Sequence, residues 1–268
     1  LFELHKITWN TKAAILEKIM KYERVHEIKN MDELKRRLSE DRRFFSYFHP
    51  ALEDEPLIFV QVALTKGLGK SIQEIMKPHS EGEKKYDTAT FYSISNCQEG
   101  LSRVTLGNFL IKRVVYEIQE ELPNIKNFGT LSPIPGFRNW FSYLDEAKIK
   151  NIIGNIPYES ISFLKSSDLK IGDTRIISNK DVMIKLVGHY LTNEKNKKNL
   201  PINDVCRFHL GNGAIIEDII VNANISETGF KRSFGVNYLY ELKNIEKNHE
   251  DYINNKRIIV SDKLKKFL

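Results

Sequence analysis

The chain has 268 residues, of which 41% are hydrophobic and 10% aromatic, and its formal net charge is +6. This composition is sufficient for a buried core in one large or two small domains and indicates a globular protein. The sequence contains neither a run of 18 apolar residues nor a charged segment followed by a short apolar one, which excludes a visible membrane span or signal peptide.

The two cysteines indicate a reducing compartment. Cys97 and Cys206 are far apart and lack the Cys-x-x-Cys or Cys/His spacing of metal ligands, which argues against a disulfide framework or a zinc site. The chain begins at Leu1 rather than at methionine, so we expect a fragment or a processed form of a longer protein. It ends in "KFL", which is not the Ser-Lys-Leu address of peroxisomal proteins.

The positive charge is compatible with nucleic acid, a membrane surface or a polyanionic small molecule. Basic residues are mostly accompanied by acidic ones, as in "MDELKRRLSEDRR", and the most basic cluster, "NEKNKKN" at 193–199, is a polar loop. Because no nucleic-acid motif with interleaved aromatic residues is present, we expect a solvated basic surface and no nucleic-acid partner.

The first half of the chain is predicted to mix helices and strands. Amphipathic periodicity indicates helices at 13–22 and 31–40. Runs of β-branched and aromatic residues indicate three strands, "FFSYF" at 44–48, "PLIFVQVALT" at 56–65 and "TATFYSISN" at 88–96.

The second half begins with the clearest helix, at 108–122, which has one apolar and one charged face. The following elements are predicted in chain order: a strand "NIKNFGTLS", an aromatic helix "RNWFSYL", a polar helical stretch around 145–166, an apolar helix at 181–191, a strand, Gly-Asn-Gly turn and strand over 205–221, a strand at 236–242 and a charged C-terminal helix. The fold class is therefore α/β (α+β), with a mixed sheet flanked by helices.

The stretch "NFGTLSPIPGF" at 127–137 places two glycines and two prolines around Ser132. Proline restricts φ and removes a backbone donor, so we expect a rigid turn at the end of a strand. A serine before a proline is usually a turn or cap residue, and the pattern alone leaves open whether Ser132 has a chemical role.

A strand, a glycine-containing loop and a helix follow one another over 88–122. The loop, "GLSRVTLGN" at 100–108, leads into a helix N-terminus, where free backbone N–H groups and Arg103 are suited to a pyrophosphate. Because the loop matches neither a P-loop nor a GxGxxG fingerprint, an ordinary strand-to-helix turn is the alternative.

Six segments in this order resemble the malonyl-CoA decarboxylase family over essentially the whole chain: "EPLIFVQVALT", "FYSIS", "GLSRVTLGNFLIKRVV", "TLSPIPGF", "FHLGNGA" and "NYLYEL". The resemblance implies a catalytic domain with a fold like that of the Gcn5-related N-acetyltransferases, spanning residues 1–268. It also implies homo-oligomerisation of the full-length protein through an N-terminal helical domain to which no segment here corresponds.

The resemblance further implies the site residues. Ser132 and His209 would be catalytic, and Tyr240 would belong to the active-site network. The acyl-CoA would be bound by Ser132, His209 and a loop made of Ser102, Arg103, Val104, Thr105, Leu106, Gly107 and Asn108. Arg103 departs from the small residue expected in that loop.

The reaction implied is the conversion of malonyl-CoA to acetyl-CoA and CO2 in fatty acid metabolism, through a thioester enolate that is then protonated on carbon, without a metal or an organic cofactor. A histidine that titrates near neutral pH suits His209 for binding the thioester oxygen or delivering the proton. Ser132, held by its turn, would bind the carboxylate or relay a proton. From sequence, His209 is expected on a strand, and Tyr238 and Tyr240 are expected to share one strand face.

Two other functions are compatible with such a fold. Acyl transfer to an amine would need an acceptor groove, of which the sequence shows no sign. A non-catalytic acyl-CoA-binding module would be expected to have lost its Ser/His pair, and both residues are present. We expect a mitochondrial or cytoplasmic protein with malonyl-CoA and acetyl-CoA as its small-molecule partners.

Overall fold

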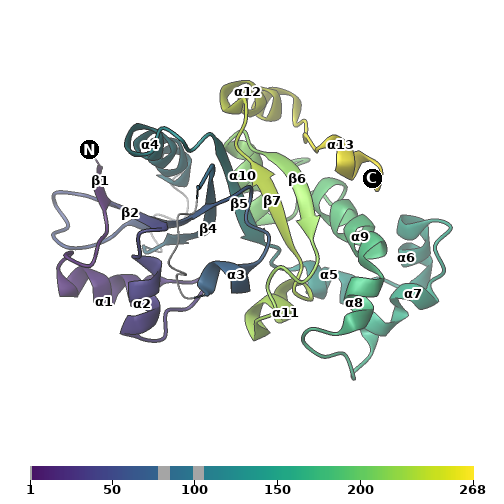
Figure 1. Ribbon diagram of the computed structural model, residues 1–268. Coiled ribbons are helices and arrows are strands. Elements are labelled where there is room, and N and C mark those ends of the chain that lie inside the picture. Colours follow the sequence, from purple (N-terminus) through teal and green to yellow (C-terminus); the bar gives the residue numbers. More distant parts are fainter. Residues whose placement is uncertain (1, 78–84, 99–105) are drawn as a thin grey trace. The chain divides into compact units, whose positions relative to one another are not determined.

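A computed structural model describes the backbone of residues 2–77, 85–98 and 106–268, together with their side chains except those of 106–109 (Figure 1). The chain forms two compact units. The first consists of Leu1–Gly69 and Glu74–Thr130, and the second of Lys70–Gln73 and Leu131–Leu268. The assignment of all 268 residues to one catalytic domain stays a prediction.

The first unit is built on a mixed sheet. Its strands are, in hydrogen-bonding order, β1 (Glu3–Lys6), β2 (Arg42–Phe48), β3 (Ile58–Thr65), β4 (Thr88–Asn96) and the first part of β5 (Asn127–Pro133). Neighbours from β1 to β4 are antiparallel, whereas β4 and β5 are parallel. Its helices are α1 (Ala13–Tyr22), α2 (Met31–Arg37) and α4 (Leu106–Glu121), and α3 (Ile72–Met76) spans the boundary between the two units. The three strands and two helices predicted for the first half of the chain are confirmed, and so is the helix predicted at 108–122.

The apolar faces of these elements form the core of the first unit. Ile15 and Ile19 of α1 and Leu34 of α2 pack with aromatic side chains of the sheet, among them Phe44 and Phe59, whose ring centroids lie 5.3 Å apart. Further along the chain, α4 buries residues at helical spacing, namely Leu110, Ile111, Val114 and Ile118. The apolar residues whose helical spacing predicted these helices are therefore the residues that are buried in the structure.

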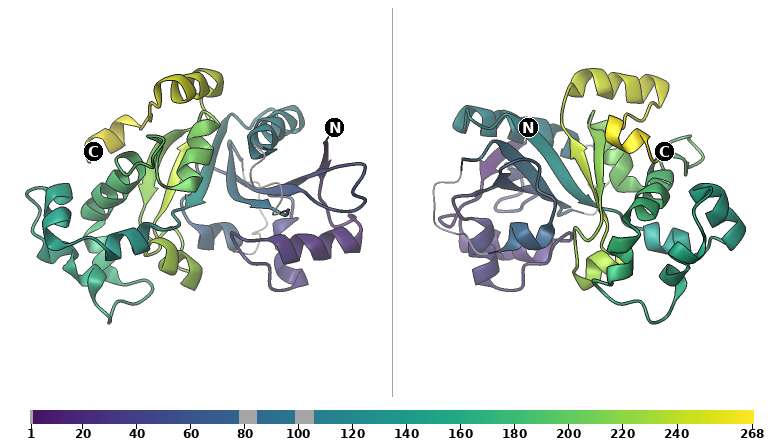
Figure 2. Two further views of the ribbon diagram at one scale, coloured as in Figure 1. Left: turned by 180° about the vertical axis from the view of Figure 1, so that it is seen from behind. Right: turned by 45° about the vertical axis from the view of Figure 1, so that its right-hand side comes forward.

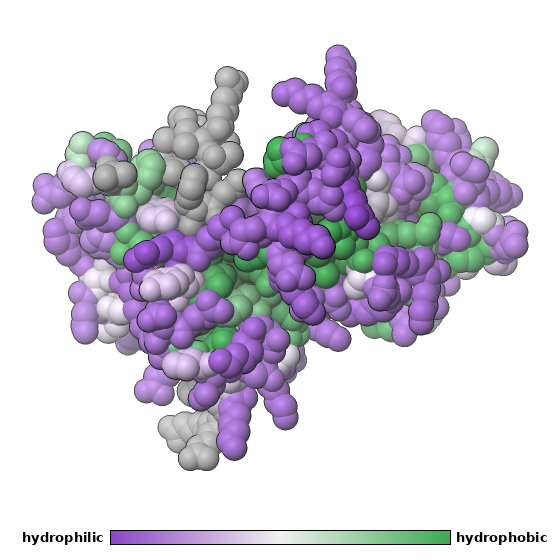
Figure 3. Space-filling model, turned by 90° about the horizontal axis from the view of Figure 1, so that it is seen from above, coloured by the Kyte–Doolittle hydropathy of each residue, from purple (hydrophilic) through white to green (hydrophobic). Residues whose placement is uncertain are grey.

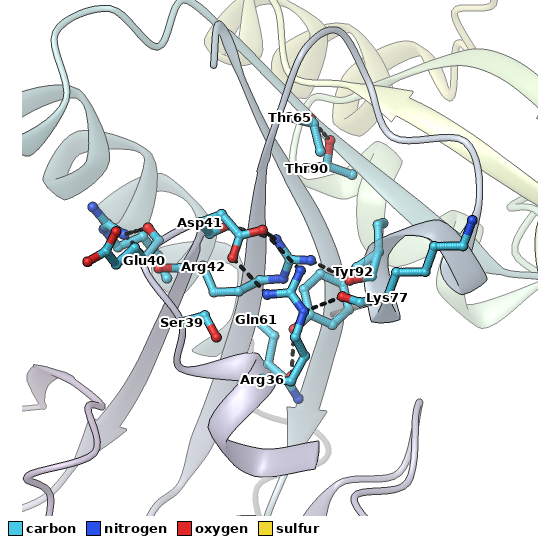
Figure 4. A network of polar contacts seen from close by, with 12 residues as sticks. Arg36, Ser39, Glu40, Asp41, Arg42, Gln61, Thr65, Lys77, Thr90 and Tyr92 are labelled. Atoms are coloured by element: carbon cyan, nitrogen blue, oxygen red, sulfur yellow. Dashed lines mark hydrogen bonds and ion pairs between the residues drawn. The ribbon is translucent and has the colours of Figure 1, made fainter. Parts of the chain in front are cut away.

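A buried ionic cluster ties α2, β2 and α3 together within the first unit (Figure 4). The carboxylate of Asp41 accepts from Arg36 Nη1 at 2.7 Å and Nη2 at 3.0 Å, and from Arg42 Nη1 at 2.7 Å. The two guanidinium groups also donate to the carbonyl oxygens of Lys77 and Ile75 at the end of α3. Because one carboxylate holds two cations away from water, its charge is essential to the cluster.

Replacing Asp41 by asparagine is expected to lower the free energy of unfolding by about 2 kcal/mol, because the two guanidinium groups lose their shared counter-ion while the size of the side chain is kept. Urea denaturation followed by circular dichroism measures the change. Glu227→Gln, which removes one partner of the exposed Glu227–Lys231 pair, is the control and should leave the transition almost unchanged. Equal stability of Asp41→Asn and wild type would contradict the expectation.

The second unit contains the end of β5 and the strands β6 (Ile215–Ile220) and β7 (Asn237–Glu241). The strand order is β5-β7-β6, and β6 and β7 are antiparallel. Its helical elements are α5 (Phe137–Ser142), α6 (Glu146–Ile153), α7 (Glu159–Ser162), η2 (Phe163–Lys165), α8 (Thr174–Ser178), α9 (Lys180–Thr192), α10 (Asp204–Gly211), α11 (Glu227–Ser233), α12 (Ile245–Asn255) and α13 (Asp262–Lys265). The α10 helix lies against one face of the β6–β7 pair (Figures 1 and 2). The apolar helix at 181–191, the strand at 236–242 and the charged C-terminal helix are confirmed.

Hydrophilic side chains cover most of the face of the molecule drawn in Figure 3. Many exposed basic residues pair with acidic neighbours, as in Lys150–Glu146 and Lys231–Glu227, which agrees with the expected solvated surface. Within the described ranges, no helix combines the length and the apolar character needed to cross a bilayer.

Candidate active site

Ser132 lies at the end of β5, where the strand runs into the turn at 133–136. The side chain is buried, with 5% of the residue exposed. The turn closes when Gly136 adopts φ +85°, and Gly136 is also the N-cap residue of α5. Any side chain at this position would be strained and would approach the hydroxyl of Tyr190, 2.9 Å from the ideal Cβ position. The predicted turn at the end of a strand is therefore confirmed, and its rigidity stays a prediction.

His209 lies on helix α10 (Asp204–Gly211), so the prediction of a strand over 205–210 is wrong. The helix begins after Asn203, whose side-chain oxygen accepts from Cys206 N at 2.8 Å. Cys206, His209 and Leu210 are buried, which is the i, i+3, i+4 spacing of a helix that covers a sheet. The Asn-Asp pair in front of this short apolar run is the capping signal that could have revealed the helix. The strand predicted after the Gly-Asn-Gly segment is confirmed as β6.

The fold brings Ser132 and His209 together within the second unit. Ser132 Oγ and His209 Nε2 are 2.9 Å apart and share a buried hydrogen bond between residues separated by 77 positions. His209 is 3% exposed. A hydroxyl and an imidazole in this arrangement can exchange a proton along one hydrogen bond, which is the geometry required for proton relay or nucleophile activation.

Burial controls the charge of His209. Removal from water lowers the pKa of its imidazole from 6.5 to about 3, so the ring is neutral at physiological pH. Its Nδ1 atom has no hydrogen-bond partner among the residues that the structure describes, and the carboxylate that completes a serine–histidine–aspartate triad is not seen there. The expectation that His209 titrates near neutral pH is therefore wrong for the unliganded chain, because desolvation outweighs the ordinary basicity of imidazole.

The buried imidazole should make stability depend on pH. In the unfolded chain His209 binds a proton as the pH falls below 6.5, whereas in the folded chain it binds one only near pH 3. Acidification between these values therefore favours the unfolded state. Between pH 6 and 4, the free energy of unfolding is expected to fall by as much as about 1.4 kcal/mol per pH unit from this residue. Urea titrations of wild type and His209→Gln at several pH values test this, and identical slopes would contradict it.

Tyr240 of β7 lies against His209. The ring centroids of the two residues are 4.4 Å apart with an interplanar angle of 30°, and Tyr238 is 4.3 Å from Tyr240 on the same strand face, as predicted. Burial raises the pKa of both phenols well above 10, so they remain neutral. The Tyr240 hydroxyl makes no hydrogen bond of standard geometry within the described ranges, and its membership of the active-site network stays a prediction.

The predicted acyl-CoA loop belongs to the first unit, and Ser102, Arg103, Val104 and Thr105 lie outside the described residues. Leu106, Gly107 and Asn108 form the first turn of α4, where only the backbone is described. The strand predicted before this segment and the helix predicted after it are confirmed as β4 and α4. Binding of a pyrophosphate at this helix N-terminus stays a prediction.

The two cysteines are free thiols. Cys206 is fully buried one helical turn before His209, and burial raises the pKa of its thiol to about 12, so it is an unreactive packing group. In the part of the chain that the structure describes, no cluster of three or more His, Cys, Asp or Glu side chains could hold a metal ion.

Two solved structures with low sequence identity define the fold class. The loading GNATL domain of CurA from Lyngbya majuscula is 12% identical, with a TM-score of 0.54 over 91% of this chain and 98% of that one. The GphF GNAT-like decarboxylase, solved with isobutyryl-CoA, is 15% identical, with a TM-score of 0.55 over 89% of this chain and 97% of that one. The chain is therefore an α/β protein with a fold like that of the Gcn5-related N-acetyltransferases, as expected.

Closer similarities identify the family. The model of the malonyl-CoA decarboxylase C-terminal domain matches residues 1–268. The mitochondrial malonyl-CoA decarboxylase of Anser anser anser is 35% identical over 99% of this chain and 57% of its own length. A crystal structure of malonyl-CoA decarboxylase from Agrobacterium vitis is 38% identical, with a TM-score of 0.87 over 99% of this chain and 67% of that one. The chain belongs to the malonyl-CoA decarboxylase family, and it spans little more than half the length of the curated relatives that it matches.

Proposed function

We propose that this chain carries the decarboxylase activity of its family and converts malonyl-CoA to acetyl-CoA and CO2. The observation that supports this most directly is the buried hydrogen bond between Ser132 and His209, two residues that the family resemblance had singled out from separate motifs. The similarity over the whole chain to proteins named malonyl-CoA decarboxylase supports the choice of substrate.

The reaction breaks the bond between the carboxylate carbon and the α-carbon. The electron pair of that bond moves to the thioester, and the negative charge of the carboxylate becomes that of an enolate oxygen as CO2 leaves. A proton, ultimately from water, then adds to the α-carbon to give acetyl-CoA. The site must therefore supply hydrogen-bond donors to the enolate oxygen and one transferable proton to carbon.

We assign these tasks to the Ser132–His209 pair. A neutral imidazole that gave its proton to carbon would become an imidazolate, and replacement of that proton by the serine hydroxyl would leave an alkoxide. The pair therefore has to take up one further proton, from water, for each turnover. Binding of an anionic acyl group beside His209 favours proton uptake by the imidazole, because a nearby negative charge raises the pKa of a base. Ser132 Oγ is positioned to donate to the substrate or to relay that proton.

Tyr240 covers one face of the imidazole and, in this proposal, keeps water from it. The loop from Ser102 to Asn108 would hold the pyrophosphate of coenzyme A at the N-terminus of α4, where backbone N–H groups are free to bind an anion. The relatives from Anser anser anser and Mus musculus are named as mitochondrial, which supports a mitochondrial location. A role in fatty acid metabolism is part of the proposal. We also propose that the full-length protein forms a homo-oligomer through an N-terminal helical domain.

The proposal is tested by incubating the purified chain with malonyl-CoA and measuring acetyl-CoA by chromatography and CO2 by a coupled assay. We expect both products in equal amounts in wild type, and both formed at least about a hundredfold more slowly in a His209→Gln preparation purified in parallel, which controls for contaminating enzymes. Binding of malonyl-CoA without release of CO2 would refute catalysis by this chain and favour an acyl-CoA-binding module. Transfer of an acetyl group from acetyl-CoA to an added amine would favour acyl transfer.

A further inference from the structure

Asn203 contacts α10, which carries His209, β7, which carries Tyr240, and the turn that follows Ser132. Its side-chain oxygen accepts from Cys206 N at 2.8 Å and so caps α10, the helix of His209. Its amide nitrogen donates to the carbonyl oxygen of Pro135 at 2.8 Å, in the turn that follows Ser132. The hydroxyl of Tyr238, on the strand of Tyr240, lies 3.4 Å from the same side-chain oxygen. Asn203 is only 2% exposed.

The carbonyl of Pro135 receives a second donor. The hydroxyl of Tyr190, on α9, lies 3.3 Å from this oxygen. Two side chains from different elements therefore hold one carbonyl, three residues after Ser132. Since Pro133 and Pro135 restrict φ in the backbone between Ser132 and this carbonyl, holding the carbonyl narrows the range of positions that the Ser132 backbone can adopt.

A capping role alone requires only the side-chain oxygen of Asn203, and serine or aspartate would supply it equally well. The amide nitrogen adds a bond that capping does not need, and this bond joins the start of the His209 helix to the Ser132 turn. Proton transfer within the pair depends steeply on the distance between the hydroxyl and the imidazole, so a link of this kind has a direct chemical consequence.

We propose that Asn203 is a positioning residue that sets the separation and orientation of Ser132 and His209. Its effect on turnover rests on the proposed decarboxylase function, whereas its effect on the geometry of the pair does not. Tyr190 assists by holding the same carbonyl from the other side.

Asn203→Ser separates positioning from capping, because serine keeps the N-cap and is too short to keep the bond to Pro135. We expect kcat for malonyl-CoA to fall roughly tenfold to a hundredfold, with KM changed less than about threefold and the melting temperature nearly that of wild type. Tyr190→Phe, which leaves the cap intact, should lower kcat several-fold in the same way. Asn30→Ser is the matched control, because Asn30 caps α2 through Glu33 N, and it should leave both kinetic constants unchanged.

Nuclear magnetic resonance of the His209 imidazole nitrogens provides a readout that does not require turnover, with the signal assigned by its loss in His209→Gln. In wild type we expect a hydrogen-bonded Nε2 that shifts in Ser132→Ala, and a shift in the same direction in Asn203→Ser but not in Asn30→Ser. These shifts in a chain that makes no acetyl-CoA would support the positioning role while refuting the decarboxylase. An Asn203→Ser variant with the wild-type His209 spectrum would overturn the inference, as would an active chain whose Asn203→Ser variant keeps the wild-type kcat.

Discussion

Replacing Ser132 by alanine or His209 by glutamine is expected to lower kcat for malonyl-CoA decarboxylation by about a hundredfold to a thousandfold. Each change removes one partner of the buried hydrogen bond, whose atoms are 2.9 Å apart. A single preorganised donor in an oxyanion-type site contributes about 3–4 kcal/mol to transition-state stabilisation, which corresponds to this loss. The effect should fall mainly on kcat, because a donor to the enolate acts on the transition state more than on the bound thioester.

The double variant distinguishes a working pair from two independent groups. If the two residues share one proton, Ser132→Ala combined with His209→Gln should be only slightly slower than the slower single variant. Multiplication of the two single effects would contradict a shared proton. Acetyl-CoA release measured at saturating malonyl-CoA gives the comparison.

Matched replacements elsewhere in the second unit control for damage to its core. Ser233 is a buried serine whose hydroxyl donates to the Val236 carbonyl at 2.6 Å, and His189 is a partly buried histidine that stacks on Trp140. Ser233→Ala and His189→Gln should keep kcat within a few-fold of wild type. Losses as large as those at Ser132 and His209 would show that the assay reports folding rather than chemistry.

Replacing Gly213 by alanine is expected to lower the free energy of unfolding by on the order of 3 kcal/mol or more. Gly213 has φ +79°, which a side chain adopts only with strain, and a methyl group there would overlap the carbonyl oxygen of Ile245 at the start of α12. The same turn is held by α12 through Asn248, whose amide donates to Gly213 O at 3.1 Å. Movement of α12 away from the turn would relieve the overlap at the cost of that bond.

Gly211 provides the internal control because it lies two residues earlier at the end of α10. Its φ is not in the left-handed region, and a methyl group there meets no atom within 4 Å. Gly211→Ala should therefore unfold in urea almost as wild type does, whereas Gly213→Ala should unfold at a much lower concentration. Similar transitions for the two variants would contradict the role assigned to this turn.

Most of the elements could be predicted from the sequence because burial follows the hydrophobic pattern. The strands at 56–65 and 88–96 correspond to β3 and β4, and the helix at 108–122 corresponds to α4. The wrong prediction of a strand at 205–210 has a physical cause. A short apolar run does not show a clear helical or strand period. A helix of only two turns that packs on a sheet also buries a similar share of its residues to a strand, so the pattern of apolar residues does not distinguish the two. The Asn-Asp pair at 203–204 favours the helix, and in the structure the side-chain oxygen of Asn203 caps α10 by accepting from Cys206 N.

The sequence by itself determined the fold class, the family and the turn after Ser132, because these depend on local periodicity, on motif order and on the restricted backbone of proline and glycine. Only the tertiary structure decided that Ser132 and His209 share a hydrogen bond, since chain folding has to bring together two positions 77 residues apart. It also decided the charge of the imidazole. The pKa of His209 depends on how completely neighbouring elements exclude water, and no pattern in the chain records that exclusion.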